Sequence, residues 1–202
     1  SDKVDTMSKY YKVDDIDNKQ IIELFELADK FQNGLQIKLN KLISLLFFQP
    51  STRTRAGFES ACKRLHCQTI VETNPRQNSA CAKQETLSDL LKTMSCYTDC
   101  IILRHPVAED VFSAIDNITV PIINAGWGSW EHPTQALIDL YTFYDCFEGH
   151  ISNIKLAIVG DLDTRTAKSI VQLAKRFDFN ITLIYPKNYS LPNEFSISQN
   201  SY

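Results

Sequence analysis

The sequence lacks several features that would assign it to a specialised class of protein. No apolar run reaches the roughly 18 residues that a membrane-spanning helix needs, and the polar segment 1–13 has no apolar core of a secretory signal. A basic surplus is also missing, since the formal net charge is −3 and the pI is near 5.8, which argues against general nucleic-acid binding. There is no internal repeat and no low-complexity tract. We therefore expect a cytoplasmic globular protein without a membrane or nucleic-acid partner.

A metal-binding cysteine pattern is absent as well. The six cysteines form no CxxC pair and match no zinc-ligand spacing. An even number of cysteines is compatible with disulfides, but the chain is neither short nor visibly secreted. Reduced cysteines in a cytosolic protein are therefore the preferred interpretation.

The 202 residues do contain enough apolar material for a packed core, at 44% hydrophobic and 10% aromatic. Short apolar segments alternate with amphipathic ones, and this alternation predicts an α/β fold with a parallel sheet flanked by helices. The segments expected as strands are 42–48, 68–71, 100–103, 120–123, 155–159 and 181–184. Residues 124–131, with two glycines, are expected to form a loop.

Helix boundaries and a domain boundary can also be predicted. Asp17 and Gln20 form a capping pair at the start of one helix, and Gly34 is a natural stop. Pro133 is suited to the first turn of another helix. A first domain is expected to span 1–149, followed at 150–202 by the start of a second α/β domain. That second part holds only one βαβ unit, which cannot bury both faces of its sheet.

The sharpest chemical signal is Ser51-Thr52-Arg53-Thr54-Arg55, which follows a buried strand and opens a helix. A helix N-terminus offers free backbone N–H groups and the positive end of the dipole, both of which favour an anion. Three hydroxyls and two guanidiniums are added there, and Arg can bind phosphate through two parallel hydrogen bonds. The alternative is an ordinary capped helix with solvated arginines. We interpret the segment as a phosphate site.

Two further segments follow strands. His132 and Gln135 lie three residues apart at a second loop-to-helix junction, so both can project from one side of the first turn. Together they could hold a planar group with a carbonyl and an NH2, although a capping histidine is an equally good interpretation. Arg104 follows the strand 100–103, where a surface ion pair is the alternative. Because ligands of open α/β sheets bind outside the strands' carboxyl ends, all three segments should line one edge.

Read together, the segments resemble the aspartate/ornithine carbamoyltransferase family. The resemblance covers roughly residues 15–185 and rests on FFQPSTRTRAGFESACKRL, SACAKQETLSDLL, IILRHP, INAGWGSWEHPTQALIDLYTF and KLAIVGDLDTRTAKS. STRTR with HPTQ is a specific pair for this family, and RHP with KxETLxD is similar to its aspartate branch rather than its ornithine branch.

This resemblance implies transfer of a carbamoyl group from carbamoyl phosphate to an amine, normally that of L-aspartate in pyrimidine biosynthesis. It implies no metal and no organic cofactor. The phosphate would be held by Ser51, Thr52, Arg53 and Thr54. The carbamoyl oxygen would be polarised by Thr54, Arg104 and His132. Gln135 would take the carbamoyl NH2, and Arg165 would bind a carboxylate of the acceptor.

The resemblance also implies an assembly and a domain arrangement. Residues Ser79 and Lys83 would reach into the active site of a neighbouring subunit, where Lys83 would contact both substrates and take part in catalysis. Shared sites of this kind imply a homotrimer. Residues 1–149 would be the carbamoyl-phosphate-binding domain, and 150–202 would be an incomplete aspartate-binding domain.

The chain departs from the family pattern at Trp127, where many aspartate enzymes carry Asp. Trp127 and Trp130 could pack a domain interface or alter the pocket. The family's later acceptor-binding segments do not occur in this sequence, so two alternatives stay open. One is a carbamoyltransferase for another amine such as ornithine, and the other is a non-catalytic paralogue. The presence of Arg53, Arg104, His132 and Lys83 argues against the second.

Overall fold

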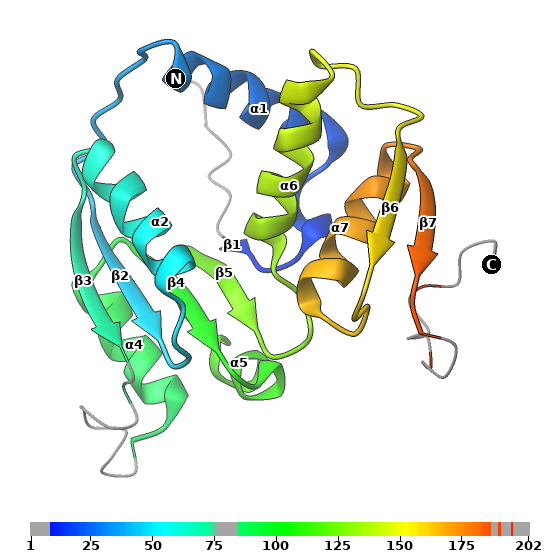
Figure 1. Cartoon of the computed structure of the whole chain (residues 1–202). Helices are drawn as coiled ribbons and strands as arrows, with labels where there is room; N and C mark the ends of the chain where they lie inside the picture. The colour runs from blue at the N-terminus through cyan, green and yellow to red at the C-terminus, as the bar shows by residue number, and fades with distance from the viewer. Residues whose placement is uncertain (1–8, 74, 76–84, 187–189, 191–194, 196–202) are drawn as a thin grey trace.

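The structure is a computed structural model that describes residues 9–73, 75, 85–186, 190 and 195. Its main feature is a sheet of five strands in the order β1-β5-β4-β2-β3, and every neighbouring pair is parallel. The strands are β1 (Lys9–Tyr10), β2 (Leu42–Phe47), β3 (Gln68–Thr73), β4 (Cys100–His105) and β5 (Ile122–Trp127). The predicted parallel α/β fold is confirmed, and the carboxyl ends of the strands share the lower edge of the sheet in Figure 1.

Two strand predictions need correction. The strand expected at 120–123 begins at Ile122 and continues to Trp127, through residues that were expected to form a loop. Pairing with β4 causes this extension, because Leu103 is in register with Asn124 and His105 with Trp127. The short strand β1 was not predicted, since its two residues become a strand only by pairing with β5.

Helices cover both faces of this sheet (Figure 1). The α-helices in the described part of the chain are α1 (Asn18–Gln32), α2 (Thr52–Arg64), α4 (Leu87–Tyr97), α5 (Ala108–Ala114), α6 (Pro133–Cys146) and α7 (Arg165–Arg176). Strand β2 is buried on both sides because its side chains alternate. Leu45 packs on the side of Cys62 of α2, while Leu46 packs on the side of Leu91 of α4.

A second sheet of two parallel strands, β6 (Lys155–Val159) and β7 (Asn180–Ile184), packs against α7. Exposure alternates along both strands. On the open face, Val159 is 71% exposed and Ile184 is 50% exposed. Within the described residues, this βαβ unit therefore covers only one face of its sheet, as the sequence predicted.

A shared apolar cluster joins the two sheets. It brings Val13 of the 3-10 helix η1 (Val13–Asp15) together with Phe25 of α1, Leu140 of α6 and Leu173 of α7. The first and last parts of the described chain consequently pack on each other around α6. The five cysteines in the described ranges are free thiols. None of the helices in these ranges has the length and hydropathy of a membrane span.

Candidate functional site

A cavity of about 860 Å³ lies at the carboxyl edge of the main sheet, between α2, α6 and the start of α7. Three arginines contribute to its lining, which contains no acidic side chain among the described residues. The lining residues are Ser51, Arg53, Thr54, Gly57, Phe58, Ala61, Arg104, His132, Thr134, Gln135, Leu137, Ile138, Arg165 and Thr166. A cavity with this lining is suited to an anion.

The start of α2 contributes free hydrogen-bond donors to the cavity. Ser51 occupies the N-cap position but makes no side-chain capping bond, so its hydroxyl is not used by its own helix. By contrast, Asp17 of α1, Thr86 of α4 and Thr164 of α7 accept the usual bond from a first-turn backbone N–H. Because the first-turn N–H groups of a helix have no partner within the helix, this start of α2 is open to a ligand.

Helix α6 also begins at the cavity without a side-chain cap. Its N-cap residue is His132, which is 6% exposed, and Pro133 follows at the first helical position. The His132 backbone N–H donates to the hydroxyl of Ser169 on α7 over 3.0 Å. The Thr134 hydroxyl lies 3.5 Å from His132 Nδ1. The first contact anchors the His132 backbone to α7, and the second involves the imidazole at the N-terminus of α6. Gln135 follows one turn later.

Arg104 reaches the cavity from the carboxyl end of β4. Its side chain is 8% exposed, and Nη1 donates to the carbonyl oxygen of Ala125 over 3.0 Å. Within the described residues, its buried Nε has no hydrogen-bond partner. Buried guanidinium donors normally find an acceptor, so this side chain has unused capacity for a ligand.

Arg165, the first residue of α7, supplies a further positive group. Its Nη1 donates to the carbonyl oxygen of Gly128 over 2.6 Å, which links α7 to the loop before α6. Burial, together with the Arg165 charge, lowers the pKa of Arg104 to about 10. Burial and the charges of Arg165 and Arg104 lower the pKa of His132 to about 4. His132 is therefore neutral near pH 7, where its ring N–H can donate a hydrogen bond.

Glycine at position 126 allows the two arginines to converge. Gly126 adopts φ +108°, and its N–H donates to Asn124 Oδ1 over 2.6 Å. A β-carbon there would lie 2.8 Å from Arg104 Nη1 and 3.2 Å from Arg165 Cζ. Only glycine leaves room for both side chains at this point of β5.

The structure brings together most of the residues that the sequence singled out, though not all of them. The cavity is lined by Ser51, Arg53, Thr54, Arg104, His132, Gln135 and Arg165. Thr52 instead lines a neighbouring hollow, beside Phe47 and Pro50. Ser79 and Lys83 lie outside the described residues.

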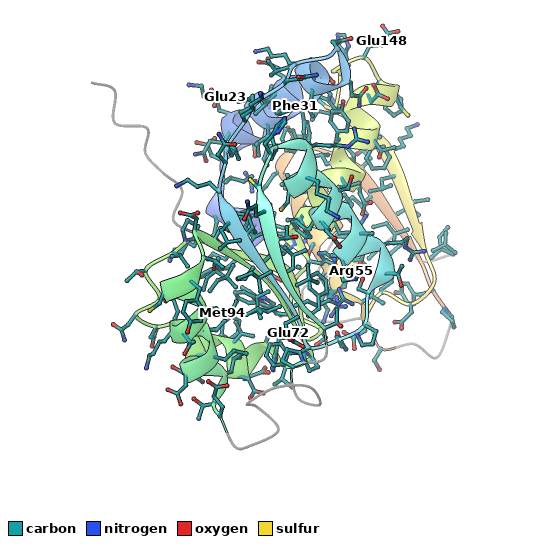
Figure 2. The ribbon with its side chains drawn as sticks, turned by 90° about the vertical axis from the view of Figure 1, so that its left-hand side faces the viewer. Glu23, Phe31, Arg55, Glu72, Met94 and Glu148 are labelled. Atoms are coloured by element: carbon teal, nitrogen blue, oxygen red, sulfur yellow. The ribbon has the colours of Figure 1, made fainter. Side chains whose placement is uncertain are left out.

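Arg55 was counted with the anion-binding guanidiniums, and this interpretation is wrong. Arg55 does not line the cavity. Its Nη1 pairs with Glu59 Oε2 at 3.0 Å, and its side chain lines the neighbouring hollow together with Thr52. Figure 2 shows Arg55 on α2 in the view towards strands β2 and β3. Residues 53 and 55 of a helix project in different directions, so only one of the two guanidiniums can reach the cavity.

Trp127 and Trp130 belong to the core rather than to the pocket. The Trp127 ring is fully buried, and its Nε1 donates to the carbonyl oxygen of Leu103 over 2.9 Å. It stacks on Trp130 at a centroid distance of 6.0 Å and contacts Tyr11 at 5.2 Å. Neither tryptophan lines the cavity, which answers the question that the sequence left open.

Sequence reasoning missed several residues that shape the cavity. Thr134 lies inside the HPTQ segment, and that position was the one available signal for it. No local pattern marks the residues that act from behind, because their contacts span distant parts of the chain. They include Ser169, whose hydroxyl accepts the His132 N–H, and Asn124, whose side chain accepts the Gly126 N–H and donates to the Glu131 carbonyl oxygen. Among the residues that the structure describes, no cluster of His, Cys, Asp or Glu is arranged to hold a metal ion.

Known proteins share both the sequence and the fold of this chain. Residues 9–145 match the family described as aspartate/ornithine carbamoyltransferase, carbamoyl-P binding domain. The chain is 38% identical to the aspartate carbamoyltransferase catalytic subunit of Archaeoglobus fulgidus, covering 93% of this chain and 64% of that protein. It is 37% identical to the ureidoglycine carbamoyltransferase of Rubrobacter xylanophilus, covering 91% of this chain and 56% of that protein.

The structural match has the same extent. The catalytic subunit of M. jannaschii aspartate transcarbamoylase superimposes with a TM-score of 0.83 at 38% sequence identity. The match covers 93% of this chain and 63% of that chain. The present chain thus spans less than two thirds of the length of these relatives.

Proposed function

The chain belongs to the aspartate/ornithine carbamoyltransferase family, and on that basis we propose that it forms the carbamoyl-phosphate-binding part of an aspartate carbamoyltransferase. The proposed reaction transfers the carbamoyl group of carbamoyl phosphate to the amine of L-aspartate, giving N-carbamoyl-L-aspartate and phosphate for pyrimidine biosynthesis. The observation that carries the proposal is the convergence on one cavity of two uncapped helix starts, Arg104 and His132.

The phosphate group is proposed to bind at the start of α2. Ser51 and Thr54 offer hydroxyl donors there, Arg53 offers a guanidinium, and the helix offers first-turn N–H groups. Arg165 adds to the positive potential on the other side of the cavity, where it is proposed to bind a carboxylate of the acceptor. Thr52 is proposed to bind the phosphate through its backbone N–H, because its side chain lines the neighbouring hollow.

The carbonyl oxygen of the carbamoyl group is proposed to face Thr54, Arg104 and His132. When an amine attacks the carbonyl carbon, negative charge develops on this oxygen, and fixed donors stabilise the transition state. A neutral His132 suits this role, since it can donate an N–H without a change of protonation. The leaving phosphate dianion can accept the amine proton, so the reaction does not need a dedicated base. Holding the reactants in line supplies much of the remaining acceleration.

Further parts of the proposal concern the assembly. Ser79 and Lys83 are proposed to enter the site of a neighbouring subunit in a cytoplasmic homotrimer, with Lys83 contacting both substrates. The domains are proposed to divide near Gly149, between the end of α6 at Cys146 and the start of β6 at Lys155.

The acceptor has a specific alternative to L-aspartate, namely ureidoglycine. The ureidoglycine enzyme is nearly as similar to this chain as the aspartate enzyme is. Both proteins are carbamoyltransferases by name, so the comparison favours carbamoyl phosphate as the donor more strongly than it favours one acceptor.

An activity assay on the full-length gene product tests the proposal. We expect carbamoyl phosphate and L-aspartate to give equal amounts of N-carbamoyl-L-aspartate and phosphate. Turnover of ureidoglycine or ornithine in place of aspartate would reassign the acceptor and leave the donor site standing. Failure of every amine, with carbamoyl phosphate still bound, would point to a non-catalytic paralogue.

Shared sites can be tested by mixing two inactive variants. Lys83→Ala and Arg53→Ala subunits, dissociated and reassembled together, should regain part of the wild-type activity because some sites then contain both intact residues. Each variant reassembled alone is the control. Absence of any recovery in mixed oligomers would contradict the shared site.

A further inference from the structure

Gln135 has an acidic neighbour one helical turn further along α6. Its Nε2 donates to Asp139 Oδ1 over 2.9 Å. Positions i and i+4 of a helix lie on the same face, so the two side chains meet beside the cavity that Gln135 lines. We infer that Asp139 is a positioning residue that presents the carbonyl end of the Gln135 amide to the cavity and thereby selects an acyl donor carrying NH2.

The inference follows from the hydrogen-bonding capacities of the two groups. A Gln amide has an accepting oxygen and a donating NH2 at nearly the same place, so either end can face a ligand. An ionised carboxylate only accepts hydrogen bonds. By holding Nε2, Asp139 leaves Oε1 as the end that is available to a ligand.

An acceptor at this position complements the rest of the cavity. Arg53, Arg104 and Arg165 only donate hydrogen bonds, so they match a phosphate and a carbonyl oxygen but not an NH2 group. The Gln135 oxygen can accept from a carbamoyl NH2. A methyl group in the same place would leave that oxygen without a donor. The inference rests on the proposed function, because it takes carbamoyl phosphate as the ligand.

A carboxyl group at position 139, beside the cavity, is energetically unfavourable unless it has a specific role. It is half-buried, burial raises the pKa of its carboxyl group, and no cation in the described part of the chain pairs with it. A carboxylate near an anion site also weakens anion binding through its charge. A simple contribution to the stability of α6 is the competing explanation.

A matched pair of stable ligands separates the two explanations. Phosphonoacetamide carries the NH2 of carbamoyl phosphate, and acetonylphosphonate has a methyl group in its place. The dissociation constants of both are measured by calorimetry on the full-length wild-type protein and its variants. We expect wild type to bind the amide about fivefold to tenfold more tightly, as one hydrogen bond would provide.

Two substitutions change what Asp139 can hold. Asp139→Asn can pair with either end of Gln135, and we expect the preference for the amide to fall about twofold to threefold. Asp139→Lys donates only and would hold Oε1, which should remove the preference. The ratio of the two affinities cancels the general effect of charge, since both ligands carry the same phosphonate. Asp145→Asn, an exposed residue on the same helix, is the matched control and should leave the ratio unchanged.

Gln135→Ala completes a double-mutant cycle. This variant should lose the preference, and Asp139→Lys added to it should have no further effect on the ratio. If wild type shows the preference and both Asp139 variants keep it, the inference is overturned while the donor site stands. If wild type binds both ligands equally, the inference is also overturned. If neither these ligands nor inorganic phosphate binds, the proposed function itself fails.

Discussion

Gly126 lies directly beneath the Arg104 guanidinium, and a β-carbon on it would come within 2.8 Å of Nη1. Arg104 has little freedom to move away, because it is 8% exposed and its Nη1 is bonded to the Ala125 carbonyl oxygen. The conformation of Gly126 in β5 thus determines the position of the buried Arg104 guanidinium.

Substitution of this glycine should therefore affect ligand binding as well as folding. In Gly126→Ala, the positive φ costs about 1–2 kcal/mol, and the added methyl displaces Arg104 from its bond to Ala125. We expect a lower melting temperature and at least about tenfold weaker phosphonoacetamide binding. Gly34→Ala is the stability control, since Gly34 also has a positive φ, of +97°, with nothing within 4 Å of the new β-carbon, and it lies outside the cavity lining. A Gly126→Ala protein that binds as tightly as wild type would show that Arg104 tolerates displacement.

Arg53 and Arg55 provide a matched pair on the same helix. Arg53→Ala removes a guanidinium from the cavity and should weaken binding of inorganic phosphate or phosphonoacetamide by about 10-fold to 100-fold, as expected for charge-assisted hydrogen bonds. Arg55→Ala removes the same charge but only breaks the pair with Glu59. Its affinity should stay within about threefold of wild type, through the loss of long-range attraction alone. Equal effects in a calorimetric titration would argue against a phosphate site at the start of α2.

His132 should make stability depend on pH. Its pKa falls from 6.5 to about 4 in the folded protein, so the unfolded chain binds this proton more readily. The contribution of neutral His132 to stability is complete above about pH 6.5 and is lost progressively as pH falls towards 4. From about pH 7 to about pH 5 the loss is about 2 kcal/mol.

Denaturant unfolding of wild type and His132→Asn at these two pH values measures the loss. The free energy of unfolding should fall by about 2 kcal/mol less in the variant, because Asn does not titrate. A His150→Asn control removes an exposed histidine and should behave like wild type. The same fall in all three proteins would exclude a depressed His132 pKa.

Glu131 holds the N-terminal segment against the loop before α6. Its Oε2 accepts the Val13 N–H over 2.7 Å, and the side chain is 6% exposed. Glu131→Ala leaves a buried N–H without an acceptor and should cost about 1–3 kcal/mol of unfolding free energy. Glu131→Gln keeps an acceptor oxygen and should lose less than half as much. Equal destabilisation of the two variants would mean that the negative charge, rather than the hydrogen bond, matters there.

Features that depend on neighbouring residues could be predicted from the sequence. Asp17 and Gln20 form the expected capping box, and Gly34 follows the end of α1 closely. The site residues were predictable for a related reason. In a parallel sheet, residues that follow strands reach the same edge, so Arg104 and His132 could be expected there. Their proximity also requires β4 and β5 to be neighbours in the sheet.

Features that depend on distant residues could not be predicted. The β5 extension through Gly126 requires β4 as a partner, and the glycine by itself indicates a loop. The burial of Trp127 follows from contacts with Tyr11 and Leu103. Arg55 was misassigned because Arg53 and Arg55 are the same residue type in one short segment. Successive positions of a helix are rotated by about 100°, so the two side chains project in different directions.

The uncapped starts of α2 and α6 imply that a ligand completes secondary structure here. Amide protons in the first turn of α2 should exchange quickly with solvent in the free protein and slow down when an anion accepts them. Those of α1, already capped by Asp17, should exchange at the same rate in both states. Occupancy of the cavity would then be recorded as local protection at two helix ends, and the two helices would gain rigidity from the molecule that they bind.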